Sequence, residues 1–134
     1  MNRYTYISIV GSLDELTIDE FRNSIRNIKD YLKDNLINNV CLIHGYMDKQ
    51  TLKNRNLDTA FIECLNFNFP NQIRFFYNGE RHIDFFEDIA SKIVIKGFRI
   101  GKQTPNSIRE CNIILKDGYL IDLNINKVVD PTKH

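Results

Sequence analysis

Residues 4–12 read YTYISIVGS, and this stretch decides how the rest of the chain is interpreted. β-Branched and aromatic side chains dominate residues 4–10, which predicts a strand. The strand stops at Gly11-Ser12, and a helix signal begins at Thr17. Strand, glycine turn and helix in this order are typical of an open α/β domain that binds a ligand. The glycine lets backbone approach the ligand, and N–H groups near a helix start can hold an anion. We therefore expect Gly11 and Ser12 to contribute to a ligand site.

The length, composition and net charge are those of an ordinary globular protein. Its 134 residues suit one domain, residues 1–134, with a single core. Hydrophobic residues make up 43% and charged residues 26%, so disorder is not expected. The formal net charge of +1 gives no global attraction to nucleic acid or to an anionic membrane. No apolar stretch approaches the roughly 20 residues that would span a bilayer.

Three cysteines, Cys41, Cys64 and Cys111, are widely spaced and sit in apolar runs. An odd number of such residues indicates reduced, buried thiols in a cytoplasmic protein. A metal site needs closer ligand spacing, such as C-x-x-C, and the chain has none. The sequence therefore indicates neither a metal nor a cofactor.

The clearest helix signal begins at Thr17. Thr17 and Glu20 have the spacing of a capping box, in which side chains bind the free N–H groups of the helix start. Four apolar residues then recur at the spacing of one helix face, namely Phe21, Ile25, Ile28 and Leu32. We expect this helix to end near Asn35.

The middle of the chain alternates strands and helices. Residues 40–43 form a short apolar run that suits a strand covered on both faces, and it ends at His44-Gly45-Tyr46. Residues 57–65 read as a helix that Pro70 stops, and residues 73–77 read as a third strand.

The last third is less regular. Residues 82–92 predict a helix. The apolar residues 93–95 could end this helix or start a strand, and we favour the strand. Thr104-Pro105 is typical of a helix start, so a short helix through Glu110 is expected. Residues 112–115 then read as a strand that turns at 116–118 and pairs with an antiparallel strand at 119–125.

Alternating strands and helices predict a single-domain, Rossmann-like, three-layer α/β fold. Its sheet is expected to be mainly parallel and flanked by helices, with an antiparallel hairpin at the C-terminus. Ligands bind such folds at the carboxyl ends of the strands, near the switch in strand order. That edge would carry Gly11, Ser12, His44, Gly45, Tyr46 and Asn78.

The order of these motifs resembles the SLOG superfamily, which includes the DNA-processing protein DprA and the Lonely-guy nucleotide enzymes. The likeness rests on the Val-Gly-Ser turn at residues 10–12, the strand ending in His44-Gly45, and the Asp-Thr-Ala helix start at residues 58–60. The helix and strand at residues 107–115 are similar to a later segment of that superfamily. The resemblance implies a Rossmann-like fold and a nucleotide ligand.

Two candidate site residues can be interpreted either as functional or as purely structural. His44 could act as an acid, a base or a ligand contact, but a histidine in a turn is often only a hydrogen-bonded surface group. Asp58 could bind a ribose or a base, or it could simply complement the dipole at its helix start. No second carboxylate pairs by pattern with Glu63 or Glu80 for glycosidic chemistry, so whether the chain is an enzyme stays open.

Residues 91–102 contain Lys92, Lys96, Arg99 and Lys102 and no acid. Such a run could bind phosphates, although it is more often a solvated strand face. Because the net charge is low and Phe98 is its only aromatic residue, we expect no tight binding of single-stranded nucleic acid at physiological salt.

Two functional hypotheses follow. The first is a small cytoplasmic domain that binds a nucleotide or nucleoside-derived ligand at Gly11, Ser12, His44, Gly45, Tyr46 and Asp58. The second is a non-catalytic protein-binding module, such as an immunity protein, an inhibitor or a phage-encoded antagonist. It is motivated by a small α/β scaffold without further glycine-rich loops. Oligomerisation is left open.

Overall fold

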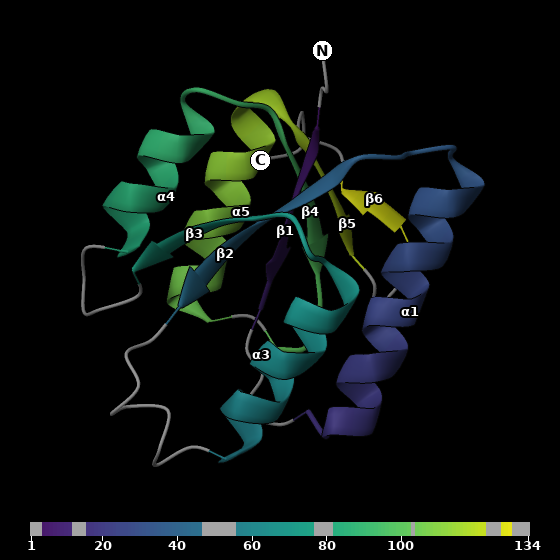
Figure 1. Ribbon diagram of the computed structural model, residues 1–134. Helices are drawn as coiled ribbons and strands as arrows, with labels where there is room; N and C mark the ends of the chain where they lie inside the picture. The colour runs from purple at the N-terminus through teal and green to yellow at the C-terminus, as the bar shows by residue number, and fades with distance from the viewer. Residues whose placement is uncertain are drawn as a thin grey trace.

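A computed structural model describes residues 4–11, 16–46, 56–76, 82–102, 104–122 and 127–129. Within these ranges, the backbone alone is described for a few residues, including 46 and 56–59. The described chain forms one three-layer α/β domain, in which helices cover both faces of a central sheet (Figure 1). The expected Rossmann-like architecture is confirmed.

The strands and helices alternate along most of the chain. In order, the elements are β1 (Thr5–Val10), α1 (Ile18–Asp34), β2 (Val40–Tyr46), α3 (Asn56–Asn68), β3 (Gln72–Phe76), α4 (His82–Ala90), β4 (Ile95–Arg99), α5 (Pro105–Asp117), β5 (Tyr119–Asp122) and β6 (Lys127–Val129). The sheet order is β3-β2-β1-β4-β5-β6. Strands β1 to β5 pair in parallel, and β6 pairs antiparallel to β5.

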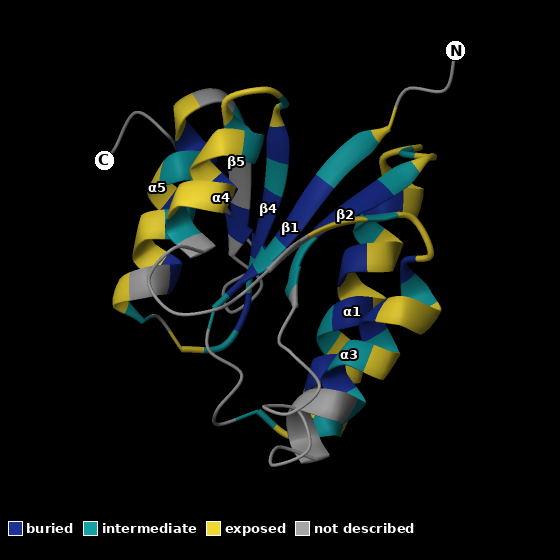
Figure 2. Cartoon of the chain, turned by 60° about the vertical axis from the view of Figure 1, so that its left-hand side comes forward, coloured by how far each residue is buried: buried dark blue, intermediate teal, exposed yellow. Residues whose placement is uncertain are grey.

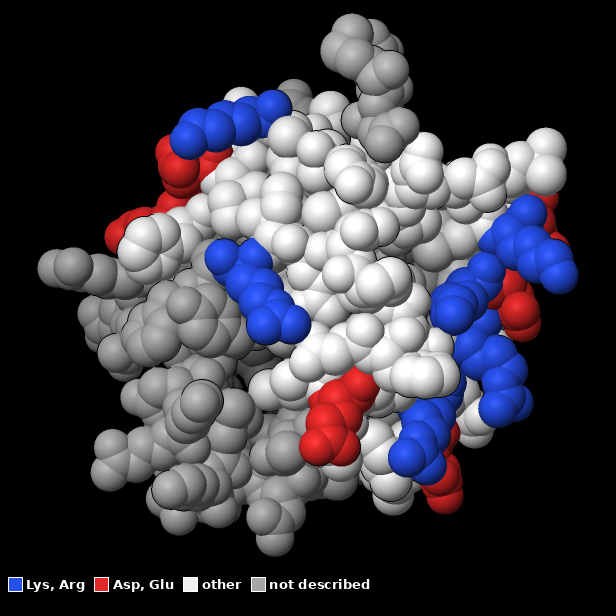
Figure 3. All heavy atoms as spheres, viewed as in Figure 1, with Lys and Arg blue, Asp and Glu red and all other residues white. Residues whose placement is uncertain are grey.

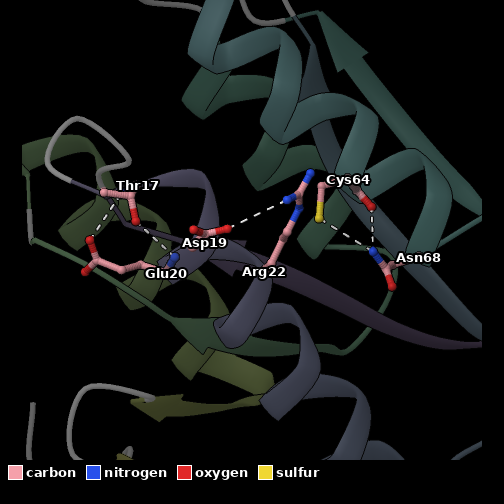
Figure 4. Close-up of polar contacts among 6 residues, drawn as sticks. All are labelled: Thr17, Asp19, Glu20, Arg22, Cys64 and Asn68. Atoms are coloured by element: carbon pink, nitrogen blue, oxygen red, sulfur yellow. Dashed lines mark hydrogen bonds and ion pairs between the residues drawn. The ribbon is translucent and has the colours of Figure 1, made fainter.

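Helix α1 follows from its sequence signals. The Thr17 hydroxyl accepts a hydrogen bond from the Glu20 N–H at 3.1 Å, and the Thr17 N–H donates to the Glu20 carboxylate at 3.2 Å (Figure 4). This is the predicted capping box. The predicted face of Phe21, Ile25, Ile28 and Leu32 is buried, so the expectation for this helix is confirmed in full.

Two apolar clusters fill the space between the sheet and its helices, as the buried strands in Figure 2 show. One lies under α1 and α3 and includes Ile7, Leu42 and Phe98. The other lies under α4 and α5 and includes Ile43 and Ile95. Ile7 and Leu42 pair in register, and so do Tyr6 and Ile95, so consecutive residues of each strand supply opposite clusters.

The C-terminal third corrects three expectations. Residues 112–115 belong to α5 and are not a strand. The segment at 119–122 is β5, which pairs in parallel with β4, and its antiparallel partner is β6. Of residues 93–95, Ile95 alone begins a strand. The reason is that α5 continues past Glu110 on one buried face, formed by Ser107, Cys111, Ile114 and Leu115.

Candidate ligand site at the carboxyl edge of the sheet

The strand order reverses between β1 and β4. The chain leaves β1 towards β2 and β3 through α1 and α3, and it leaves β4 towards β5 through α5 on the other face. Val10 and Arg99 pair in register at the ends of the two strands, and the Ile100 N–H donates to the Val10 carbonyl at 2.9 Å. In doubly wound folds, such a reversal opens a crevice beyond the carboxyl ends of the strands.

Two glycines follow these strand ends. Gly11 has φ +133° and Gly101 has φ +63°, values that favour glycine. A Cβ atom at Gly11 would lie 1.8 Å from the Ile100 carbonyl oxygen. Packing between the ends of β1 and β4 therefore requires a glycine at position 11. Its conformation is explained without a ligand, so a substitution there would test packing as much as binding.

Helix α5 begins beside the reversal point. The Thr104 hydroxyl accepts from the Ser107 N–H at 3.1 Å, and the Ser107 hydroxyl accepts from the Thr104 N–H at 2.7 Å. Pro105 opens the helix, as predicted, and the first turn carries no acidic residue. The positive end of the helix dipole is thus not offset by a neighbouring carboxylate of its own first turn.

Basic residues flank this helix start, but the basic run of the sequence is not one patch. Lys102 is exposed and Arg99 is half-buried near the end of β4. Lys92 instead pairs with Asp88 at 3.2 Å, and Lys96 lies 5.6 Å from the centre of the Tyr31 ring on the α1 face. Sequence reasoning did not assign Arg99, Gly101 and Lys102 to the site. A glycine after a strand, with basic neighbours, was the signal that could have identified them.

His44 lies within β2 and pairs in register with Arg74 of β3. Its Nε2 atom is buried and has no hydrogen-bond partner among the described residues. Burial, and secondarily the nearby Arg74 charge, lowers the His44 pKa to about 4. The reading of His44 as a hydrogen-bonded surface group in a turn is therefore wrong. A neutral imidazole with an unpaired buried nitrogen can accept or donate one hydrogen bond to a ligand.

The remaining predicted residues are placed only in part. Gly45 and Tyr46 continue β2, so the strand is longer than predicted and the side chain of Tyr46 is not described. Asp58 lies in the first turn of α3, in agreement with its expected helix-start position, but its side chain is not described. Ser12 and Asn78 lie outside the described residues. The structure therefore brings Gly11, His44 and Gly45 to the same edge of the sheet.

Glu110, on the second turn of α5, is a titratable group that the sequence did not single out. Burial raises the pKa of its carboxyl to about 7. Within the described ranges, no group of three or more His, Cys, Asp or Glu residues could hold a metal ion. In the same ranges, no helix is long and apolar enough to cross a membrane.

Comparison with known proteins gives a fold and no family. No protein-family model matches the chain, and no curated protein matches it. A 5′-exonuclease of bacteriophage T5 is similar in structure, with a TM-score of 0.51 and 8% identity over 96% of this chain and 54% of the exonuclease. The T5 flap endonuclease in complex with DNA and metal ions has a TM-score of 0.47 and 11% identity, and 58% of it is covered.

The chain thus spans little more than half the length of these T5 structures. At 8% identity, the likeness to the exonuclease concerns the fold alone. Fold and edge geometry together define a doubly wound α/β domain whose strand order reverses between β1 and β4. Its function has to be argued from the residues at that edge.

Proposed function

We propose that this chain binds a nucleotide or nucleoside-derived ligand at the carboxyl edge of its sheet, across the reversal between β1 and β4. One observation carries the proposal: the backbone turns at Gly11 and Gly101 lie beside the start of α5, which has no acid in its first turn. A phosphate placed there would meet helix N–H groups and the charges of Arg99 and Lys102.

The second half of the ligand would lie along β2. His44 and Gly45 occupy the strand next to β1, at the same edge. A neutral His44 would hydrogen-bond the sugar or base without adding charge. The three cysteines are all free thiols, which supports the cytoplasmic location expected from the sequence.

Thermal unfolding in the presence of a nucleotide panel tests this proposal. A ligand at 100 times its dissociation constant should stabilise the fold by about 2.7 kcal/mol, which would raise the melting temperature by roughly 10 °C. Lys102→Ala should reduce the shift given by phosphorylated ligands. Lys116→Ala removes the same charge near the end of α5 and should leave the shift unchanged.

Two results would count against nucleotide binding. One is a panel in which no nucleotide or nucleoside moves the melting temperature. The other is a shift that Lys102→Ala and Lys116→Ala reduce equally, because such a ligand would respond to net charge and not to this edge. Gly11 is left unchanged in these tests, since its substitution collides with the Ile100 carbonyl.

The opposite edge of the sheet favours a second candidate, the non-catalytic protein-binding module. Leu36, between α1 and β2, is 86% exposed, and Val94, just before β4, is 61% exposed. Tyr4 precedes β1 and is also exposed. Connections into parallel strands lie at the amino edge, so these apolar side chains mark one edge, and exposed apolar surface is common where proteins bind.

Capture of host proteins on the immobilised chain, with identification by mass spectrometry, tests this second candidate. A specific partner should be lost when Leu36 and Val94 are both replaced by Asp. A partner retained by that variant, or recovery of the bare chain alone under mild salt, would contradict it.

A further inference from the structure

A groove of about 700 Å³ lies between α1 and α3, in the helix layer on one face of the sheet. Three basic side chains of α1 line it, namely Arg22, Arg26 and Lys29. On α3 it is lined by Ala60, Glu63, Cys64, Phe67 and Asn68. The two walls therefore differ, because the α1 wall carries three basic side chains and one acid, Asp30, whereas Glu63 is the one charged residue that lines the α3 wall.

The basic wall is one stripe of the helix. Arg22, Arg26, Lys29 and Lys33 are spaced four, three and four residues apart, so they share one side of α1 over about 16 Å. All four are exposed. Figure 3 shows Lys and Arg side chains gathered over α1, on the right of that view.

Two side chains of this stripe, Arg22 and Lys29, extend towards α3. Arg22 extends from α1 towards Cys64 of α3 (Figure 4), and its only described ion pair is a long one of 3.7 Å to the exposed Asp19. Lys29 reaches the Asn68 side-chain oxygen at 3.4 Å across the groove. Arg26 makes no ion pair within the described part of the chain, although Asp30 also lines the groove.

The α3 wall presents an aromatic ring. Phe67 is 88% exposed although it lies on a packed helix, and it borders the groove. Phe61 and Leu65 on the buried side of α3, and Phe69 just after the helix, fill the core, so the fold does not need Phe67 for packing. An exposed ring beside a row of positive charges is the combination with which proteins bind single strands: charges follow the phosphates, and bases stack on the ring.

We propose that the groove between α1 and α3 binds a short segment of single-stranded nucleic acid. The α1 stripe contacts the phosphates, and a base stacks on Phe67. Glu63, on the same wall, accepts a hydrogen bond from an amino group of a base. A strand has charged phosphates on one side and bases on the other, and the two walls show the same asymmetry. An acidic peptide would place carboxylates against Glu63 as well as against the basic wall, so a peptide fits less well.

This site is separate from the basic run at residues 92–102, which is dispersed over different parts of the fold. Binding through the three basic side chains that line the groove weakens steeply with salt, with a log–log slope of about −2 for a single strand. The proposal therefore agrees with the expectation of no tight binding at physiological salt and predicts binding at low ionic strength.

Fluorescence anisotropy of a labelled oligodeoxycytidylate of about 12 nucleotides, titrated with the chain at several salt concentrations, tests the proposal. Arg22→Ala with Arg26→Ala should weaken binding and reduce the magnitude of the salt slope by about 1.4. The control pair, Lys92→Ala with Lys116→Ala, removes the same charge from the other helix layer and should leave the slope unchanged.

Phe67→Ala should weaken binding about 5- to 100-fold with no change in the salt slope, because it removes stacking and no charge. An abasic oligonucleotide with the same phosphates should bind the unaltered chain as weakly as the oligodeoxycytidylate binds the Phe67→Ala variant. Since Phe67 is exposed, circular dichroism of the variant should match that of the unaltered chain.

Three results would overturn the proposal. The first is the absence of binding at low ionic strength. The second is an equal loss for the α1 pair and the control pair, which would mean general charge attraction. The third is polyglutamate binding as tight as the oligonucleotide, which would assign the groove to an acidic protein. None of these results affects the thermal-shift test at the carboxyl edge, which uses other residues and other ligands.

Discussion

The two faces of the sheet are packed differently. Under α1 and α3, twelve described residues form one buried apolar cluster with close aromatic contacts, including Phe21–Phe61 at 4.6 Å between ring centres. Under α4 and α5, the buried cluster has seven described residues, and Phe86 is its one aromatic member. Ser8 and Ser107 are also buried on this second face, and Glu110 is mostly buried.

This difference in packing implies that the two layers contribute differently to stability and to ligand binding. The first face is an almost wholly apolar core, so its helices can carry charge on their outer sides without loss of packing. The second face holds polar groups close to the start of α5, beside the proposed ligand edge. Polar groups in such a place cost stability unless they are hydrogen-bonded. The first face should therefore contribute more to stability. Each face also carries one group with a shifted pKa: His44, which alternates with Ile43 and shares the side of Leu42, on the first face, and Glu110 on the second.

The largest expected effect is the loss of a buried ring. Phe21→Ala on the first face and Phe86→Ala on the second should each cost about 3–5 kcal/mol in free energy of unfolding. Phe21 and Phe61 should in addition be coupled by about 0.5–1.5 kcal/mol in a double-mutant cycle, because their rings are in contact. Urea denaturation measures both quantities. If the two single-mutant losses at Phe21 and Phe61 simply add, the ring contact contributes nothing of its own, and the first face is not distinguished by aromatic packing.

The next effect is a pair of opposed pH dependences. His44 has a folded-state pKa of about 4 against 6.5 in its ordinary state, so the unfolded chain binds its proton first and stability falls as pH drops from about 6.5 to about 4. Glu110 has a folded-state pKa of about 7 against 4.5, so the folded chain keeps its proton longer and stability falls as pH rises from about 4.5 to about 7.

Each group contributes at most about 3 kcal/mol over its window. Between about pH 4.5 and 6.5 the two slopes oppose each other, and their sum should be close to zero. Glu110→Gln should therefore leave stability rising with pH in that window, and His44→Gln should leave it falling. Denaturant unfolding at pH 4.5, 5.5 and 6.5 measures this change of slope relative to the unaltered chain. Parallel curves for all three chains would contradict the assigned pKa shifts.

Helix caps give a smaller effect. Thr17→Ala on the first face and Thr104→Ala on the second should each cost about 1 kcal/mol, because each removes a capping hydrogen bond. We expect the larger loss at Thr104, since the backbone N–H that loses its acceptor belongs to Ser107, which is buried. Thermal unfolding of the two variants compares them directly. A larger loss at Thr17 would indicate that the burial of Ser107 does not matter.

The smallest effect concerns surface ion pairs, one on each layer. Asp19–Arg22 on α1 and Asp88–Lys92 at the end of α4 are both exposed. Asp19→Asn and Asp88→Asn should change stability by less than about 0.5 kcal/mol, and added salt should reduce the change further. A loss above 1 kcal/mol for either variant would show that a charge network reinforces that layer.

Part of the candidate site was accessible from the sequence. The edge position of Gly11 and of His44-Gly45 followed from the order of strands and turns, and the helix start at Thr104-Pro105 followed from its residues. The buried Nε2 of His44 did not follow, because burial depends on neighbours that are distant in the sequence, such as strand β3. The close approach of Gly11 to the Ile100 carbonyl also could not be predicted from the sequence, because these residues are far apart in the chain.

The sequence by itself determined the elements with complete local signals. Helix α1 has both a capping box and a full apolar face, and both depend on residues within a few turns of each other. The alternation of strands and helices also determined the fold class, since parallel strands need helical crossovers.

Only the tertiary structure decided the C-terminal third. The short apolar run at residues 112–115 suits a buried strand or a buried helix face equally well, because periodicity cannot distinguish them over four residues. It is helical because Ile114 and Leu115 complete a face that packs against the sheet beside β4. With that segment in α5, β5 becomes a parallel partner of β4. Strand pairing joins residues distant in the chain, so no local pattern specifies it.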